Sequence, residues 1–313
     1  MKPRPSVIAH RGASGYLPEH TSEAKVLAHA MGADYIEQDV VATRDSELIV
    51  IHDIFLDDVT DVAEVFRGRA RDDGHYYAID FDLAEIRELR VVERRHRGTD
   101  KPLYAGRFRG HDARFRVATL GEEIALLQGL NATSGRLAGI CPEIKEPRWH
   151  FEHGVDLAQL VLRELGRYGY RDHESPLYVQ CFDSRELKRM RTELGTRLKL
   201  LQLLPASDAA SPTLTPEIFA PIADYAAAVG LPYELLVDRS GGRAPVLAPS
   251  SLLPIVRNAG LTVFAYTLRR DRVPDWAPSF EELLRLLLAE PSVGGLFCDH
   301  PDIAVRVRNS LSS

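Results

Sequence analysis

The sequence predicts an α/β protein of the (β/α)8 TIM-barrel class with a small insertion after the second strand. Short apolar segments alternate with amphipathic segments along most of the chain, which is typical of parallel strands joined by helical crossovers. Nine strands are expected, and two of them are close enough in sequence to form a hairpin, so eight parallel strands remain. The length of 313 residues suits one barrel of about 250 residues with about 60 residues more.

Each expected strand is an apolar run next to a turn or a helix. The nine runs are Ser6–His10, Tyr35–Val41, Leu48–His52, Gly139–Lys145, Leu177–Phe182, Leu198–Leu204, Tyr225–Gly230, Leu261–Leu268 and Gly295–Asp299. A short polar turn, residues 44–47, separates the second run from the third. This turn is too short for a crossover helix, so these two runs should pair as a hairpin.

Several expected helices have recognisable ends. The helix Thr21–Met31 should stop at Gly32, because glycine is common just after a helix. Three helices should begin at pairs with the spacing of a capping box, namely Thr119 with Glu122, Asp183 with Glu186 and Ser279 with Glu282. The first of these should run through Leu130.

Residues 53–115 interrupt the alternation. Charged residues make up 26 of these 63, against 27% in the whole chain. Aromatic residues are also frequent, and Leu83–Leu89 resembles a short helix, so we expect a folded insertion. Without it 250 residues remain, the usual size of a barrel. We predict a barrel domain of residues 1–52 and 116–313, and an insertion subdomain of residues 53–115 that borders the active site and narrows substrate choice.

Composition restricts the partners. With 39 basic and 45 acidic residues the net charge is −6, and no basic stretch carries interleaved aromatics, so nucleic acid is not expected. No apolar stretch reaches the ~20 residues of a membrane span. Cys141, Cys181 and Cys298 lie in apolar runs and are expected to be buried and reduced. The expected partner is a small-molecule substrate, and a homodimer is left open.

The chain as given shows no signal peptide, so the expected location is the cytoplasm. A periplasmic location is the alternative if a signal peptide was removed.

Acidic and basic residues follow or occupy several strands. His10 and Arg11 come directly after the first strand, where the active-site face of a barrel lies. Glu37 and Asp39 are two residues apart in a strand, so both carboxylates lie on one face. A divalent cation would neutralise them, and oxygen ligands favour Ca²⁺ or Mg²⁺. The alternative is that this face reaches water at a sheet edge.

Glu143 and Lys145 repeat this spacing in a later strand. Glu143 is a candidate third carboxylate and Lys145 a candidate phosphate contact, although the two residues could equally form a plain ion pair. His52 ends the strand that folds back along Glu37 and Asp39, and its alternative role is structural. Nucleotide-loop, HExxH, CxxC and GxSxG motifs are absent from the sequence.

In combination these segments resemble the glycerophosphodiester phosphodiesterase family. The matching segments are 10–21 (His-Arg-Gly-Ala-Ser-Gly-Tyr-Leu-Pro-Glu-His-Thr), 35–40, 50–53, 142–145, 179–183, 265–267 and 295–302. They cover nearly the whole chain, and the insertion resembles that of the longer type found in secreted bacterial enzymes. One departure is His20, where many members carry asparagine, although the longer type also has histidine there.

The resemblance implies a role for each matching residue. Members of the family hydrolyse glycerophosphodiesters, such as glycerophosphocholine or glycerophosphoethanolamine, to glycerol 3-phosphate and an alcohol. The implied roles are His10 and His52 as the acid/base pair, Glu37, Asp39 and Glu143 as ligands of a divalent metal (Ca²⁺ or Mg²⁺), Arg11 and Lys145 as phosphate contacts, and Gln180, Phe182 and Tyr266 as pocket residues. The attacking oxygen is either the glycerol hydroxyl, through a cyclic phosphate, or water.

Two other functions fit the same fold. One is a phospholipase D-like or phosphoinositide-phospholipase-like lyase of the same group of barrels, acting on lysolipids or phosphoinositides. The other is a binding protein without catalysis, in which we would expect at least one gap in the set of site residues. No such gap is seen in the sequence.

Overall fold

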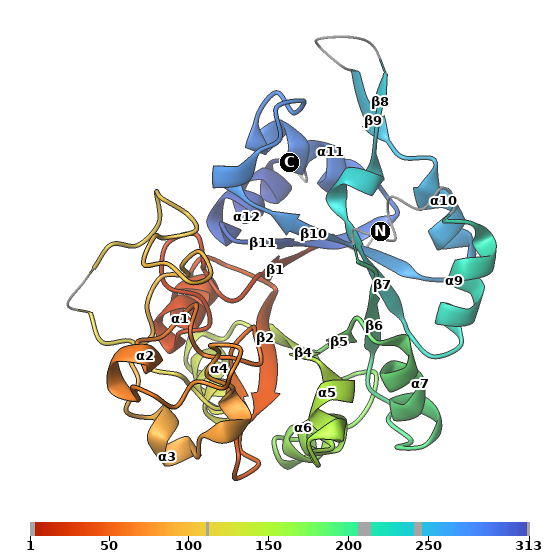
Figure 1. Cartoon of the computed structure of the whole chain (residues 1–313). Helices are drawn as coiled ribbons and strands as arrows, with labels where there is room; N and C mark the ends of the chain where they lie inside the picture. The colour runs from red at the N-terminus through yellow and green to blue at the C-terminus, as the bar shows by residue number, and fades with distance from the viewer. Residues whose placement is uncertain (1–3, 111–112, 206–213, 241–245, 312–313) are drawn as a thin grey trace.

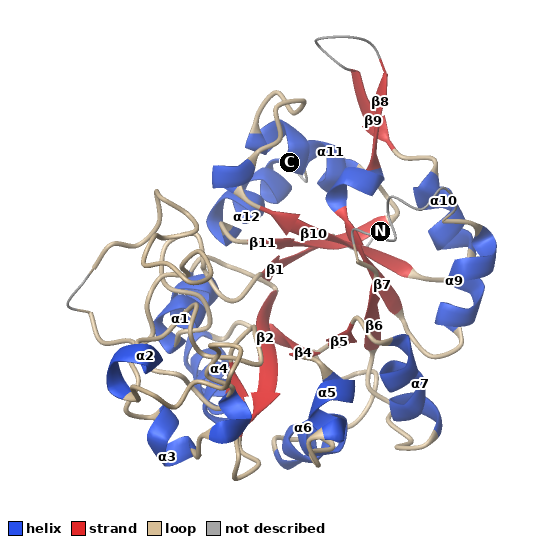
Figure 2. Ribbon diagram, in the orientation of Figure 1, coloured by secondary structure: helices blue, strands red, loops and turns tan. Residues whose placement is uncertain are grey.

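The computed structural model describes residues 4–110, 113–205, 214–240 and 246–311. Eight parallel strands form a closed ring with the helices outside it (Figures 1 and 2). The strands are β1 (Ser6–Ala9), β2 (Tyr35–Ala42), β4 (Gly139–Ile144), β5 (Val179–Cys181), β6 (Leu200–Leu203), β7 (Ala228–Pro232), β10 (Thr262–Leu268) and β11 (Val293–Cys298). Pairing of β1 with both β2 and β11 closes the ring, which confirms the predicted (β/α)8 barrel.

Helices follow most of the barrel strands and cover the ring from outside (Figure 2). They are α1 (Ser22–Ala30), α4 (Leu120–Ser134), α5 (Pro147–Glu152), α6 (Leu157–Arg167), α7 (Ser184–Thr192), α9 (Pro216–Ala223), α10 (Leu252–Asn258), α11 (Phe280–Ala289) and α12 (Pro301–Ser310). Among the described residues, no helix is both long and apolar enough to cross a membrane.

The predicted helix ends are largely confirmed. Helix α4 has a complete capping box, in which the side chains of Thr119 and Glu122 each bond the other's backbone N–H. Asp183 and Ser279 also accept backbone N–H bonds at the starts of α7 and α11. Glu186 and Glu282, which were expected to complete these two capping boxes, instead form ion pairs with Arg189 and Arg285. Each arginine lies one helical turn further on and competes for the carboxylate.

The predicted hairpin is confirmed. Strand β3 (Leu48–Val50) pairs antiparallel with β2, with Val50 opposite Val40. A second hairpin, β8 (Val237–Ser240) with β9 (Val246–Pro249), projects from the barrel at the top of Figure 1 and was not predicted. Three of the four residues of β8 are exposed, so no apolar run marks this strand in the sequence.

The insertion folds beside β2, at the lower left of Figure 1. It contains α2 (Val62–Val65), a 3₁₀ turn η1 (Ala78–Asp80) and α3 (Leu83–Ile86), which is shorter than expected. Its apolar side chains, among them Leu56, Phe81 and Leu89, form a cluster of their own against β3. This cluster accounts for the folded character predicted from the aromatic content, whereas the boundaries 53 and 115 stay a prediction. Residues 111–112 lie outside the described residues.

The barrel interior has an apolar layer and a polar layer. Ile8, Cys141, Leu201, Phe264 and Phe297 belong to the cluster inside the ring, whereas the largest apolar cluster includes side chains of both the strands and the surrounding helices. All three cysteines are buried and free, as predicted. Parallel strands bring their carboxyl ends to one side of the barrel, where the polar layer lies.

Candidate active site

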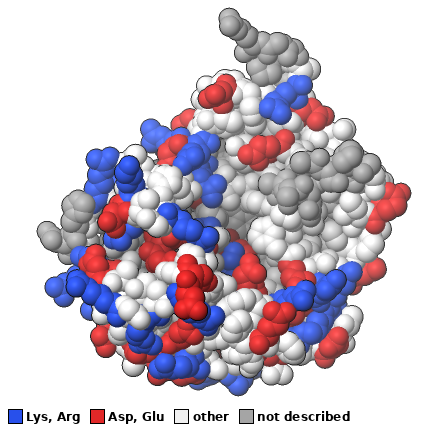
Figure 3. Space-filling model, viewed as in Figure 1, with Lys and Arg blue, Asp and Glu red and all other residues white. Residues whose placement is uncertain are grey.

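A cavity of about 600 Å³ opens at the carboxyl ends of the barrel strands. Nine of the ten predicted site residues line it, namely His10, Arg11, Glu37, His52, Glu143, Lys145, Gln180, Phe182 and Tyr266. The tenth, Asp39, is buried. Figure 3 shows basic and acidic side chains close together on this face, most densely over the insertion at the left. Leu103 and Tyr104, which lie within the predicted insertion, also line the cavity.

Strand register brings the three predicted carboxylates together. Asp39 on β2 lies opposite Glu143 on β4, and Glu37 lies two residues before Asp39 on the same strand. Each of these residues offers one carboxylate oxygen, and the three oxygens lie within 4.8 Å of one another. All three side chains are buried, so the alternative of a sheet edge that reaches water does not hold. The strands fold this way because the side chains of a strand alternate between its two faces: Ile36, Val40 and Ile144 pack in the large apolar cluster with the helices, and the acids lie on the opposite face.

Burial makes this acidic cluster electrostatically costly. Burial and the neighbouring carboxylates raise the pKa of Glu37 well above its usual range. Burial also raises the pKa of Glu143 to about 7, although Lys145 opposes the shift. Burial disfavours the ionised form of Asp39 too, but His20 and Lys145 outweigh it and the pKa lies well below the usual range. Two of the three carboxyl groups therefore resist ionisation until positive charge is added.

The donor set fits a divalent cation. Three carboxylates converge, and among the described residues Asp39 Oδ1 has no hydrogen-bond partner although it is buried. Hard oxygen donors of this kind are the ligands that Ca²⁺ and Mg²⁺ prefer. A bound cation would also supply positive charge that favours the ionised forms of Glu37 and Glu143, whose pKa values burial raises.

Two cations and an amide border the acidic cluster. Lys145 Nζ lies 2.7 Å from Glu143 Oε1, so the simple ion pair considered from the sequence is present in this structure. The backbone N–H of Arg11 donates to Glu37 at 2.9 Å, and the Arg11 backbone has a positive φ of 58°. Gln180 donates its side-chain N–H to the other oxygen of Glu37 at 2.8 Å, so it orients this carboxylate.

The aromatic pocket residues lie farther out. The rings of Phe182 and Tyr266 meet edge to face, with centroids 6.1 Å apart. Lys145 Nζ lies 5.9 Å from the centre of the Phe182 ring. The side chain of Phe182 is partly exposed, so these rings form one wall of the cavity near its mouth.

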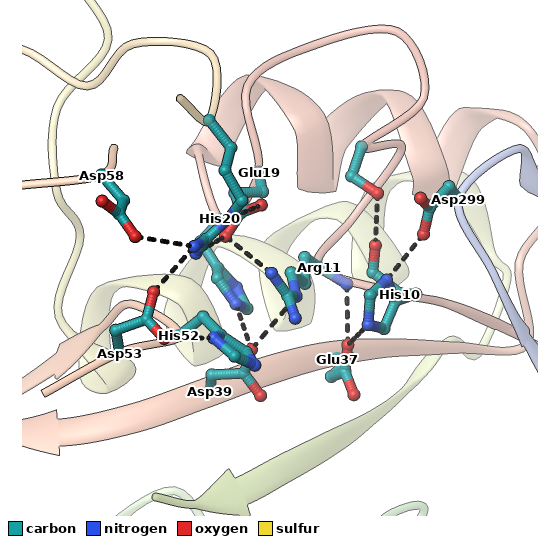
Figure 4. A network of polar contacts seen from close by, with 12 residues as sticks. His10, Arg11, Glu19, His20, Glu37, Asp39, His52, Asp53, Asp58 and Asp299 are labelled. Carbon is teal, nitrogen blue, oxygen red and sulfur yellow. Dashed lines mark hydrogen bonds and ion pairs between the residues drawn. The ribbon is translucent and has the colours of Figure 1, made fainter. Parts of the chain in front are cut away.

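Each predicted catalytic histidine has an aspartate partner (Figure 4). His10 Nδ1 lies 2.6 Å from Asp299 Oδ1, and His52 Nδ1 lies 2.8 Å from Asp53 Oδ1. Burial is the main cause that lowers the pKa of both histidines to about 4. A neutral histidine can satisfy the carboxylate only by donating its Nδ1–H, and its Nε2 then carries the lone pair. Both rings are therefore arranged as proton acceptors at Nε2.

Sequence reasoning gave no role to the residues that hold this arrangement. Asp299 follows the last barrel strand as His10 follows the first, and pairing of β1 with β11 makes them neighbours. The sequence signal that could have identified Asp299 is its position directly after the last barrel strand, which pairs with the strand that precedes His10. Glu19 and His20 also belong to the network in Figure 4: Glu19 accepts from Arg11 at 2.9 Å, and His20 lies 2.7 Å from Asp39.

Comparison with known proteins assigns the chain to a family. The model of the "Glycerophosphoryl diester phosphodiesterase family" matches residues 10–303. A glycerophosphodiester phosphodiesterase of Haemophilus influenzae is 38% identical over 97% of this chain and 90% of its own length. One of Treponema pallidum is 35% identical, over 96% of this chain and 90% of its own.

A solved structure shares the fold. It is a phosphodiesterase of Oleispira antarctica in complex with the product sn-glycerol-3-phosphate, with a TM-score of 0.65 and 20% identity over 99% of this chain and 98% of the other. The family model and the two relatives each span nearly all of the chain, barrel and insertion together. The protein therefore belongs to the glycerophosphoryl diester phosphodiesterase family and is an enzyme.

Proposed function

We propose that the protein hydrolyses glycerophosphodiesters to glycerol 3-phosphate and an alcohol, with a divalent cation and two histidines. The observation that carries this proposal is one cavity that holds three convergent carboxylates and two histidines, each fixed by an aspartate. Glycerophosphocholine and glycerophosphoethanolamine are the proposed substrates. The name of the Haemophilus influenzae relative and the product in the Oleispira antarctica structure support the same reaction class.

The first requirement of the reaction is to offset the negative charge of the phosphodiester. Arg11 and Lys145 line the cavity beside the carboxylates and supply fixed positive charge there. Glu37, Asp39 and Glu143 are the proposed ligands of Ca²⁺ or Mg²⁺, which when bound would stabilise negative charge on the phosphoryl oxygens.

The second requirement is movement of two protons. One histidine accepts the proton of the attacking oxygen at Nε2, while Asp299 or Asp53 stabilises the imidazolium that forms. The other histidine protonates the leaving alkoxide. It must therefore gain a proton first, and the approach of an anionic phosphodiester favours its charged form. The same pair serves whether the attacking oxygen belongs to water or to the glycerol group.

The test is release of glycerol 3-phosphate from a panel of glycerophosphodiesters, with lysophosphatidylcholine as the comparison substrate. The expected result is glycerol 3-phosphate from glycerophosphocholine or glycerophosphoethanolamine and no turnover of the lysolipid. Turnover of the lysolipid alone, or a cyclic phosphate as the final product, would contradict the proposal and favour the lyase.

Removal of metal should abolish this activity. We expect that a chelator stops the release of glycerol 3-phosphate and that Mg²⁺ or Ca²⁺ restores it, since the three carboxylates then regain their counter-charge. Glu143→Gln should raise the metal concentration needed for half-maximal activity, whereas the exposed Glu152→Gln should not. Full activity of the chelated protein would overturn the metal assignment.

A further inference from the structure

Two arginines of the insertion reach the aspartates that hold the histidines. Asp53 binds His52 with one carboxylate oxygen and Arg94 with the other, at 2.7 Å from Arg94 Nη1. Asp299 likewise binds His10 with Oδ1, and its Oδ2 lies 2.6 Å from Arg107 Nη2. The two halves of the site thus repeat one pattern of histidine, aspartate and arginine.

Both guanidinium groups are buried, and each binds a carboxylate of the barrel through two hydrogen bonds. The side chain of Arg94 is 9% exposed and binds both oxygens of Glu19, at 2.9 and 2.7 Å. That of Arg107 is 4% exposed and binds both oxygens of Asp271, at 2.7 and 3.0 Å. Bidentate pairs fix a guanidinium in position as well as in charge. Each arginine therefore reaches its histidine's aspartate from a rigid attachment.

We propose that Arg94 and Arg107 are positioning residues, which hold Asp53 and Asp299 so that these aspartates orient His52 and His10 for catalysis. The inference rests on the proposed function for its kinetic readout. It means that the insertion completes the active site in addition to bordering the cavity. The competing explanation is that both arginines only attach the insertion to the barrel through Glu19 and Asp271.

The two arginines should differ in importance. Asp299 Oδ2 also lies 3.1 Å from Arg269 Nε, which follows β10 in the barrel. Among the described residues, Arg94 is the one cation within ion-pair distance of Asp53 apart from His52 itself. Loss of Arg107 therefore leaves Asp299 a second arginine, whereas loss of Arg94 leaves Asp53 with its histidine alone.

The test is a set of double-mutant cycles on kcat and KM for glycerophosphocholine. Arg94→Gln should lower kcat about 10- to 100-fold with KM changed less than about threefold, and Arg107→Gln should lower kcat less than about tenfold. Added to Asp53→Asn, Arg94→Gln should cause no further loss of kcat. Added to Asp299→Asn, it should lower kcat by its full single-variant factor, so that the two losses multiply. Attachment alone predicts losses that multiply in both backgrounds, and that result would overturn the proposal.

Matched controls are substitutions of other aspartates that the same two guanidinium groups approach. Asp58 lies 3.8 Å from Arg94 and Asp271 binds Arg107, yet neither contacts a catalytic histidine. Asp58→Asn should keep kcat within about threefold of the parent protein, and Asp271→Asn should lower kcat by no more than Arg107→Gln does. Arg94→Lys, which keeps the charge, should recover part of the kcat lost in Arg94→Gln. A control that loses as much kcat as Arg94→Gln, or a lysine that recovers none, would favour attachment alone.

A spectroscopic readout separates this inference from the proposed function. In ¹⁵N spectra of the metal-free protein, His52 should be a single Nδ1-protonated tautomer, and Arg94→Gln should produce a mixture of tautomers. A parent protein without turnover would contradict the proposed function and leave this measurement intact. An unchanged His52 tautomer in folded Arg94→Gln would overturn the positioning role.

Discussion

The two histidines that we propose as the acid/base pair are held in different ways. His10 and Asp299 are 289 residues apart, but they follow paired barrel strands, and their side chains are 10% and 1% exposed. His52 and Asp53 are consecutive residues after the β3 hairpin strand, and their side chains are 29% and 20% exposed. The barrel therefore fixes the first pair through its sheet and Arg269, to which the insertion adds Arg107, whereas the second pair depends on Arg94 of the insertion. The half of the site that contains His10 and Asp299 should therefore be rigid, and the half that contains His52 and Asp53 should be more mobile.

Loss of either histidine should have the largest effect. His10→Asn and His52→Asn should each lower kcat by about 10²–10⁴, because each removes one proton-transfer group. The measurement is kcat for glycerophosphocholine at saturating metal, together with the melting temperature. The exposed His173→Asn is the control and should change neither quantity. If either site variant keeps parental turnover in a folded protein, that histidine has no part in the reaction.

Removal of the aspartate charges should distinguish the two halves. Asp53→Asn and Asp299→Asn should each lower kcat about 10- to 100-fold, since a charge-assisted hydrogen bond contributes about 1.5–3 kcal/mol. Asp299→Asn should also destabilise the protein by about 3–5 kcal/mol, because it removes a buried carboxylate that pairs with His10, Arg107 and Arg269. The partly exposed Asp53→Asn should cost much less stability. Urea unfolding measures both, and equal losses of stability would contradict the comparison.

Low pH should weaken the attachment of the insertion at the His52–Asp53 half of the site, and this effect should be smaller than those of the substitutions above. His52 and Arg94 outweigh burial and hold the pKa of Asp53 below its usual range, and Arg11 and Arg94 do the same for Glu19. A carboxyl group whose pKa is lower in the folded than in the unfolded protein stabilises the folded protein. This contribution is complete above the pKa of the unfolded state, about 4, and is lost as the pH falls from there toward the pKa of the folded state.

Hydrogen exchange can measure this loosening. We expect protection factors of insertion amides near Arg94 to fall about tenfold from pH 5 to pH 3, ahead of those in the barrel strands. Arg94→Gln should lower the protection at pH 5 and flatten this pH dependence. Constant protection in the parent protein down to pH 3 would show that these carboxylates do not hold the insertion.

The sequence predicts the barrel half of the site better than the insertion half. All eight barrel strands are apolar runs, so their carboxyl ends could be located and Glu37, Asp39 and Glu143 placed together. The β8–β9 hairpin was missed because it lacks such a run. Arg94 and Arg107 could not be singled out among the many charges of the insertion, since their burial is a result of tertiary packing.

The most direct test of the central claim is a crystal structure with glycerol 3-phosphate and Mg²⁺. We predict the cation on Glu37, Asp39 and Glu143, and the phosphate within hydrogen-bond distance of Arg11 and Lys145. Nε2 of His10 and His52 should face phosphate or bridging oxygens, with both Nδ1 atoms still on their aspartates. A phosphate bound elsewhere, or with either histidine turned away from it, would contradict the proposed site.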